Sequence, residues 1–162
     1  MEAIFDFFSV FGKEAALFII SMFPIVELRG AIPFGAALGM DPVTVYLLAI
    51  LGNLLPVPFL VLLIRPIFNY LKHLPKVEPY IQKLEDRAYS KAKHKAAVTF
   101  WGLFVFVAIP LPGTGAWTGS LIAALLNMRL RNAFGAICLG VLVAGLIMLV
   151  VSFGAAGLIR AL

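Results

Sequence analysis

Two proline- and glycine-rich stretches interrupt the apolar sequence of this chain, at residues 24–33 and 110–119. Proline removes a backbone donor and clashes with the preceding turn, and glycine leaves the backbone unrestrained, so neither stretch is expected to form regular helix. In hydrocarbon, backbone that has left the helix is tolerated only where protein or a water-filled cavity surrounds it. We therefore predict that these two breaks form the working site.

The composition identifies the environment of these breaks. Of the 162 residues, 62% are hydrophobic and only 13% are charged, which is far from an ordinary soluble domain. Because one membrane crossing takes about 20 residues, the chain supplies two full spans plus shorter intramembrane pieces. We predict an all-α integral membrane protein that forms a single transmembrane domain over residues 1–162, with the lipid bilayer as its main partner.

The net charge of +5 comes mostly from a hydrophilic connector, residues 65–97, and membrane topology explains it better than nucleic-acid binding does. Basic residues at four-residue spacing in the connector predict either an amphipathic helix on the cytoplasmic surface or a solvated loop. The sequence contains no recognisable nucleophile–base pair, metal-ligand cluster or phosphate loop, and Cys138 is the single cysteine. We therefore expect neither an enzyme nor a cofactor or metal site.

Each half of the chain has the same hydropathy plan: a short apolar arm, a broken stretch, a second short arm and a full-length span. Full spans are predicted at residues 43–64 and 132–159. Asp41-Pro42 supplies the N-cap of the first span, and Asn53, Pro56 and Pro58 are expected to interrupt it. The shorter pieces are an interfacial helix within residues 1–13 and half-length arms over residues 15–23, 34–40, 96–110 and 120–127.

A shift of 88 residues aligns half 1, at about residues 1–64, with half 2, at about residues 98–162. If each break is a re-entrant hairpin, the halves are inverted; if each is a kinked full span, they are parallel, and charge counting leaves both open. We expect two facing re-entrant helical hairpins in an inverted repeat, because the arms are half-length and the turns fall mid-membrane. The shift superimposes Pro24 on Pro112, Ala36 on Ala124, Leu38 on Leu126, Met40 on Met128, Leu51 on Leu139 and Gly52 on Gly140.

Small residues recur every four positions in the second span, at Ala136, Gly140 and Ala144. Such a stripe allows another helix to approach closely. The approaching helix is expected either within the monomer or across a homodimer.

Glu27 and Arg29 are the only strongly ionisable side chains that the pattern places deep in apolar sequence, where a charge costs roughly 2.5–3.5 kcal/mol. One interpretation is a structural ion pair that fixes the hairpin turn; because residues two apart diverge on a helix, such a pair requires irregular backbone. The other is that Glu27 takes up a proton during transport while Arg29 binds an anionic group of the substrate.

The remaining candidates for substrate or ion binding carry neutral polar groups. Thr114, Trp117 and Thr118 lie in the second break, where packing and capping are the alternative roles. Asn53 in the first span could be a polar group of the pathway, with a plain interhelical hydrogen bond as the alternative.

The motifs Glu27-Leu-Arg-Gly-Ala-Ile-Pro33 and Pro110-Leu-Pro-Gly-Thr-Gly-Ala-Trp-Thr-Gly119 resemble those of the small multidrug export protein family of prokaryotes, and the resemblance covers nearly the whole chain. That family is in turn distantly similar to the DedA/VTT membrane proteins, which have two facing re-entrant hairpins. DedA-like members are associated with lipid-carrier transport and proton coupling, and eukaryotic relatives with lipid scrambling.

The resemblance implies a multi-pass, proton-coupled transporter of the prokaryotic inner (plasma) membrane that moves a small amphipathic or lipid-phosphate substrate. Residues 65–97 are then cytoplasmic, and Glu27, Arg29, Thr114, Trp117 and Thr118 match the family motifs. The alternatives are an uncoupled lipid scramblase and a non-transporting, membrane-organising protein.

Overall fold

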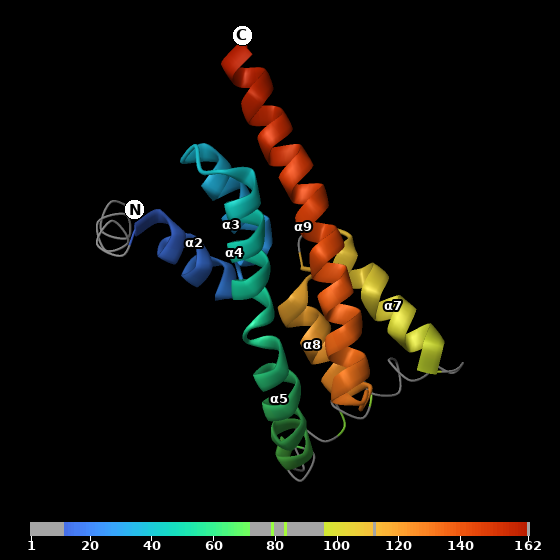
Figure 1. Ribbon diagram of the computed structural model, residues 1–162. Coiled ribbons are helices and arrows are strands. Elements are labelled where there is room, and N and C mark those ends of the chain that lie inside the picture. Colours follow the sequence, from blue (N-terminus) through green and yellow to red (C-terminus); the bar gives the residue numbers. More distant parts are fainter. Residues whose placement is uncertain (1–11, 72–78, 80–82, 84–95, 112, 162) are drawn as a thin grey trace. The chain divides into compact units, whose positions relative to one another are not determined.

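The computed structural model describes residues 12–71, 79, 83, 96–111 and 113–161 (Figure 1). Within this part of the chain every regular element is a helix, which confirms the predicted all-α class. The predicted interfacial helix within residues 1–13 and the basic stripe of the connector lie almost entirely outside the described residues. The helices are α2 (Gly12–Met22), α3 (Glu27–Ala37), α4 (Pro42–Leu54), α5 (Val57–Leu71), α7 (Ala96–Ala108), α8 (Ala116–Leu125) and α9 (Leu130–Ala161).

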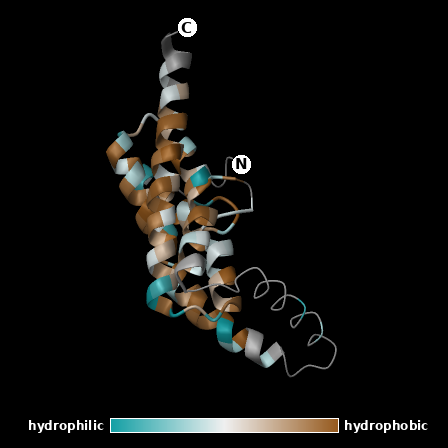
Figure 2. Cartoon of the chain, turned by 90° about the vertical axis from the view of Figure 1, so that its right-hand side faces the viewer, coloured by the Kyte–Doolittle hydropathy of each residue, from teal (hydrophilic) through white to brown (hydrophobic). Residues whose placement is uncertain are grey.

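Two helical stretches are long and apolar enough to cross a membrane, Pro42–Ile67 and Leu130–Ala155, with mean hydropathies of 2.5 and 2.8. Hydrophobic residues predominate along the central part of α9 (Figure 2). Both stretches coincide with the spans expected from the sequence, so the number and location of membrane-length segments are confirmed. Together with the composition, they place the protein in a membrane.

The first of these stretches is interrupted at residues 55–56, between α4 and α5. Pro56 and Pro58 cannot donate to the carbonyls of Gly52 and Leu54, the acceptors that regular helix would give them. Asn53 itself lies within α4, so it does not break the helix as expected. The interruption follows from the two prolines.

The two broken stretches are shorter than expected, and the prediction that all of residues 24–33 and 110–119 leave the helix was wrong. In the first, only residues 23–26 separate α2 from α3, and Pro33 lies inside α3. In the second, residues 109–115 separate α7 from α8. An internal proline costs one helical hydrogen bond, and packing of the buried neighbour Ile32 offsets that cost.

The chain divides into two compact units, and the first, called unit 1, comprises residues 1–56 and 141–162. Within it α2, α3 and α4 pack against one another around fully buried side chains such as Leu17 and Val45. The Tyr46 hydroxyl donates a hydrogen bond to the carbonyl of Leu142 at 3.1 Å. Because Leu142 belongs to α9, this bond joins the part of α9 that lies in unit 1 to α4.

Unit 2 comprises residues 57–140 and contains α5, α7, α8 and the first part of α9. α8 packs against both α5 and α7. At Gly140 of α9, an added Cβ would lie 2.7 Å from Val107 Cβ and 3.0 Å from the Phe104 carbonyl oxygen, so α7 approaches the small-residue stripe closely. The stripe therefore has a partner within the monomer, and the homodimer stays a prediction.

The same backbone cap follows the two short helices α3 and α8. Gly39 and Asn127, which are 88 residues apart, both have left-handed backbone with φ of 68° and 48°. Their N–H groups donate to the carbonyls of Ala36 and Ala124. The backbone hydrogen bonds donated by the residues before and after them also correspond between the two halves. α4 and α9 then begin at positions 42 and 130. The two halves therefore share one helix-cap geometry at a spacing of 88 residues, and the inverted repeat stays a prediction.

Candidate functional site

The first break joins α2 to α3 through residues 23–26, and its geometry is strained where α3 begins. Glu27 has φ of 49°, in the left-handed region that a side chain with a Cβ rarely adopts. Its N–H donates to the Phe23 carbonyl at 2.9 Å, which closes the turn. A left-handed non-glycine residue costs on the order of 1–3 kcal/mol and persists only where its surroundings enforce it, often at functional sites.

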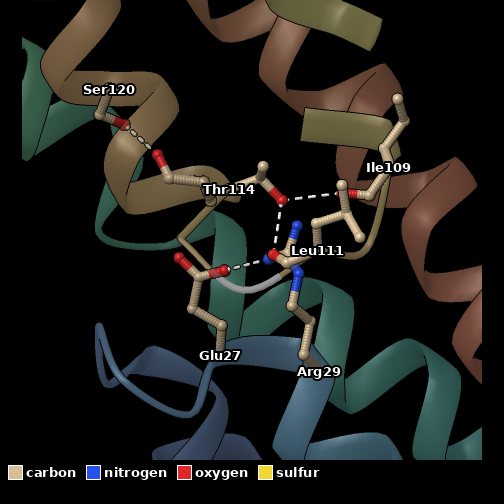
Figure 3. A network of polar contacts seen from close by, with 7 residues as sticks. Glu27, Arg29, Ile109, Leu111, Thr114 and Ser120 are labelled. Carbon is tan, nitrogen blue, oxygen red and sulfur yellow. Dashed lines mark hydrogen bonds and ion pairs between the residues drawn. The ribbon is translucent and has the colours of Figure 1, made fainter. Parts of the chain in front are cut away.

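This backbone brings together the two ionisable residues that the sequence singled out. Arg29 Nη1 donates to Glu27 Oε2 at 2.5 Å, and the Glu27 and Arg29 side chains are 5% and 16% exposed (Figure 3). The contact between residues two apart agrees with the prediction that such a pair requires irregular backbone. Unit 1 therefore contains a buried carboxylate paired with a guanidinium at the turn between two half-length helices.

Asn53 is the second buried polar group of unit 1. Its exposure is 0%, and neither its side-chain oxygen nor its side-chain nitrogen has a hydrogen-bond partner among the described residues. The interhelical hydrogen bond that was the alternative role for Asn53 is therefore not found there. A buried amide left unsatisfied costs about 1–3 kcal/mol, so a residue of this kind calls for an explanation beyond folding.

The second break, in unit 2, is stabilised by hydrogen bonds of the Thr114 side chain. Its hydroxyl lies 2.8 Å from the carbonyl oxygens of both Ile109 and Leu111, and it can donate its proton to either (Figure 3). Gly113 and Gly115 have positive φ of 81° and 131°, which the turn requires and which glycine permits. This geometry matches the capping role that was the alternative for Thr114.

Trp117 and Thr118 lie in the first turn of α8 and are half-buried. They belong to unit 2 with Thr114, whereas Glu27, Arg29 and Asn53 belong to unit 1.

Two buried hydroxyls were not singled out by the sequence analysis. Ser21 donates to the Phe18 carbonyl at 2.7 Å, and Ser120 donates to the Ala116 carbonyl at 2.6 Å. Both bonds run back to the preceding helical turn, which is the ordinary way for serine to be satisfied inside an apolar helix. The signal in the sequence was a single serine within each apolar arm.

A pocket of about 420 Å³ lies elsewhere in unit 2, at the turn between α8 and α9. Thr114, Trp117 and Thr118 do not line it. The residues around it are Thr99, Leu126, Asn127, Met128, Arg129 and Asn132.

Comparison with known proteins identifies a family. A family model described as "Putative small multi-drug export protein" matches residues 27–147. The matched range begins at Glu27, directly after the first break, and includes the second break and both helix caps. No curated protein matches the chain, and no solved structure does.

Proposed function

The chain belongs to the small multi-drug export protein family, and on that premise we propose that it is a proton-coupled membrane exporter of a small amphipathic or lipid-phosphate substrate. The observation that carries the proposal is the buried Glu27–Arg29 pair at a strained turn between two half-length helices. A carboxylate in such surroundings can exchange its arginine partner for a proton, and the released guanidinium can bind an anionic group of the substrate.

Asn53 adds a neutral polar group to the proposed pathway. Its buried amide offers two N–H donors on Nδ2 and one acceptor oxygen, Oδ1, a combination that suits a substrate hydroxyl or a water molecule. We propose that the second half of the chain contributes Thr114, Trp117 and Thr118 to substrate binding. The aromatic ring of Trp117 would contact the apolar part of an amphipathic substrate.

The proposed architecture is an inverted repeat of two facing re-entrant hairpins, α2–α3 and α7–α8, similar to that of the DedA/VTT proteins. The half-length helices and the matching caps support it. We further propose that the protein lies in the inner membrane of a prokaryote, with residues 65–97 on the cytoplasmic side.

Cysteine-accessibility mapping tests this topology after Cys138→Ala removes the native thiol. Single cysteines would replace Lys13, Asp41, Ser90 and Arg129. Labelling of positions 13 and 41 on one face, with 90 and 129 on the other, supports the hairpins. Labelling of position 129 on the face shared by 13 would overturn them.

Transport is tested with reconstituted vesicles, a fluorescent amphipathic dye and a fluorescently labelled phospholipid. The expected result is dye or lipid movement driven by a pH gradient in the wild type and lost in Glu27→Gln. Glu14→Gln, which changes an exposed carboxylate of α2, is the matched control and should transport normally.

Two other outcomes would replace the proposal. Lipid movement that ignores the pH gradient and runs equally in both directions identifies an uncoupled scramblase. Absence of movement of either probe favours a membrane-organising protein. If Glu27→Gln with Arg29→Met is stable and still transports along the pH gradient, Glu27 has no part in the mechanism.

A further inference from the structure

Arg65 is half-buried and lies on the same side of α5 as two buried valines. Val57, Val61 and Arg65 recur every four residues and therefore share one side of the helix. Val57 and Val61 are 0% exposed, whereas Leu62 and Leu63 on other sides of the helix are exposed. Since α5 packs against α8 within unit 2 (Figure 1), the Arg65 side chain leaves the helix on the side that faces protein.

The guanidinium of Arg65 has two buried N–H groups, at Nε and Nη2, that have no hydrogen-bond partner among the described residues. These two groups lie on the same edge of the planar guanidinium and point in parallel. That edge can bind two oxygens of one phosphate or carboxylate group at once. Buried N–H donors without acceptors cost free energy, and an anion that accepts from both would offset that cost.

Membrane topology alone does not explain this arrangement. A basic residue that marks the edge of a span ordinarily extends its charged group into water or the lipid headgroups. Arg131, near the start of α9, does so and is exposed. Arg65 is within the last turn of the membrane-length stretch Pro42–Ile67, and it holds one edge of its guanidinium buried.

We infer that Arg65 is a phosphate-binding residue, with Nε and Nη2 each donating a hydrogen bond to a phosphate oxygen. At the end of a membrane span two sources of this group are in reach, a phospholipid headgroup and dissolved phosphate. The site belongs to unit 2 and concerns binding alone. It stands whether or not the Glu27–Arg29 pair takes part in transport.

A carboxylate of the protein is the rival occupant. All acidic residues in the sequence range of unit 2 lie in the connector: Glu78, Glu85 and Asp86. The combined variant Glu78→Gln, Glu85→Gln, Asp86→Asn removes this possibility without changing Arg65.

The test measures thermal unfolding of the full chain in a sugar-based detergent that carries no phosphate. Phosphatidylglycerol or inorganic phosphate is then added, with diacylglycerol and chloride as the respective controls. The variants are Arg65→Gln, Arg65→Lys and Arg131→Gln, the last being a matched change of an exposed arginine. Arg65→Lys keeps the charge but lacks the parallel pair of donors. It therefore tests the role of these donors even if Arg65→Gln does not fold.

The expected result is an upward shift of the wild-type Tm with one of the two phosphate sources, which identifies that source. Arg65→Gln should lose the shift, and Arg65→Lys should weaken the apparent affinity by about tenfold or more. Arg131→Gln and the acidic triple variant should keep it. The inference is overturned if neither source raises the Tm of the wild type, or if Arg131→Gln loses as much of the Tm shift as Arg65→Gln does. It is also overturned if the triple variant abolishes the stability difference between Arg65 and Arg65→Lys, because a connector carboxylate would then be the partner.

Discussion

Ser21 of α2 packs directly against Gly52 of α4, and the contact leaves no room for a side chain at position 52. A Cβ added to Gly52 would overlap both the Ser21 hydroxyl oxygen and the carbonyl oxygen of Phe18, which accepts the hydrogen bond of Ser21. The two helices therefore meet backbone to backbone at this point. It lies one residue before the buried Asn53, so helix packing and the proposed polar pathway are adjacent in α4.

Gly52→Ala is expected to destabilise the protein by about 1–3 kcal/mol or more, because the overlapping carbonyl belongs to the backbone and cannot rotate away. Gly102→Ala is the matched control, since nothing lies within 4 Å of its added Cβ. It should raise stability by up to about 1 kcal/mol through helix propensity. Thermal unfolding in detergent measures both, and equal effects of the two substitutions would contradict the close approach.

The Glu27–Arg29 pair predicts a non-additive pair of substitutions. If Glu27 is the coupling site, Glu27→Gln should fold; if the pair is only structural, Glu27→Gln should lower the free energy of unfolding by roughly 3–5 kcal/mol, because it removes the carboxylate from a buried ion pair. Combining it with Arg29→Met removes both charges and should recover most of the loss. Denaturation of the two single variants and the double variant gives the coupling energy, and additive losses would show that the pair does not interact.

Asn53→Leu is expected to keep or raise stability while it impairs transport. The substitution removes an unsatisfied buried amide, whose burial costs about 1–3 kcal/mol, and replaces it by an apolar side chain of similar size. Asn132→Leu, which changes an exposed asparagine of α9, is the control for the chemical change itself. A strong loss of stability in Asn53→Leu would mean that the amide is satisfied in the membrane and serves folding.

The N-cap of α4 predicts a stability change in acid. The backbone and side chain of Thr44 donate to Asp41 Oδ2 at 2.9 Å and 3.1 Å, and these hydrogen bonds hold the pKa of Asp41 below its ordinary value of 3.8. A carboxylate with a lowered pKa contributes stability that is complete above its ordinary pKa and is lost as the pH falls through the lowered pKa.

The comparison uses thermal unfolding of the wild type and Asp41→Asn as a function of pH. Asparagine is also a good N-cap but does not titrate, so the wild type should lose stability relative to the variant only in acid below about pH 4. Asp41→Ala should be less stable than both near neutral pH. A difference between wild type and Asp41→Asn that stays constant in acid would show that the cap carries no charge effect.

The sequence by itself determined the features that depend on local chemistry. The length and apolarity of two segments give the membrane spans, and Asp41-Pro42 gives the start of α4, because spanning and capping depend on neighbouring residues alone. The 88-residue repeat reappears in the caps at Gly39 and Asn127 for the same reason. The pairing of Glu27 with Arg29 was one of two interpretations that the sequence allowed.

Only the tertiary structure decided what is buried and which segments pack together. It accommodates Pro33 inside α3. It also packs α5 against α8 and joins the unit 1 part of α9 to α4, although these segments are distant in sequence. Among the described residues it also leaves the Asn53 amide, and Nε and Nη2 of Arg65, without hydrogen-bond partners. The physical reason is that burial and hydrogen-bond satisfaction are set by the helices that surround a residue, and the pattern along one helix does not contain them.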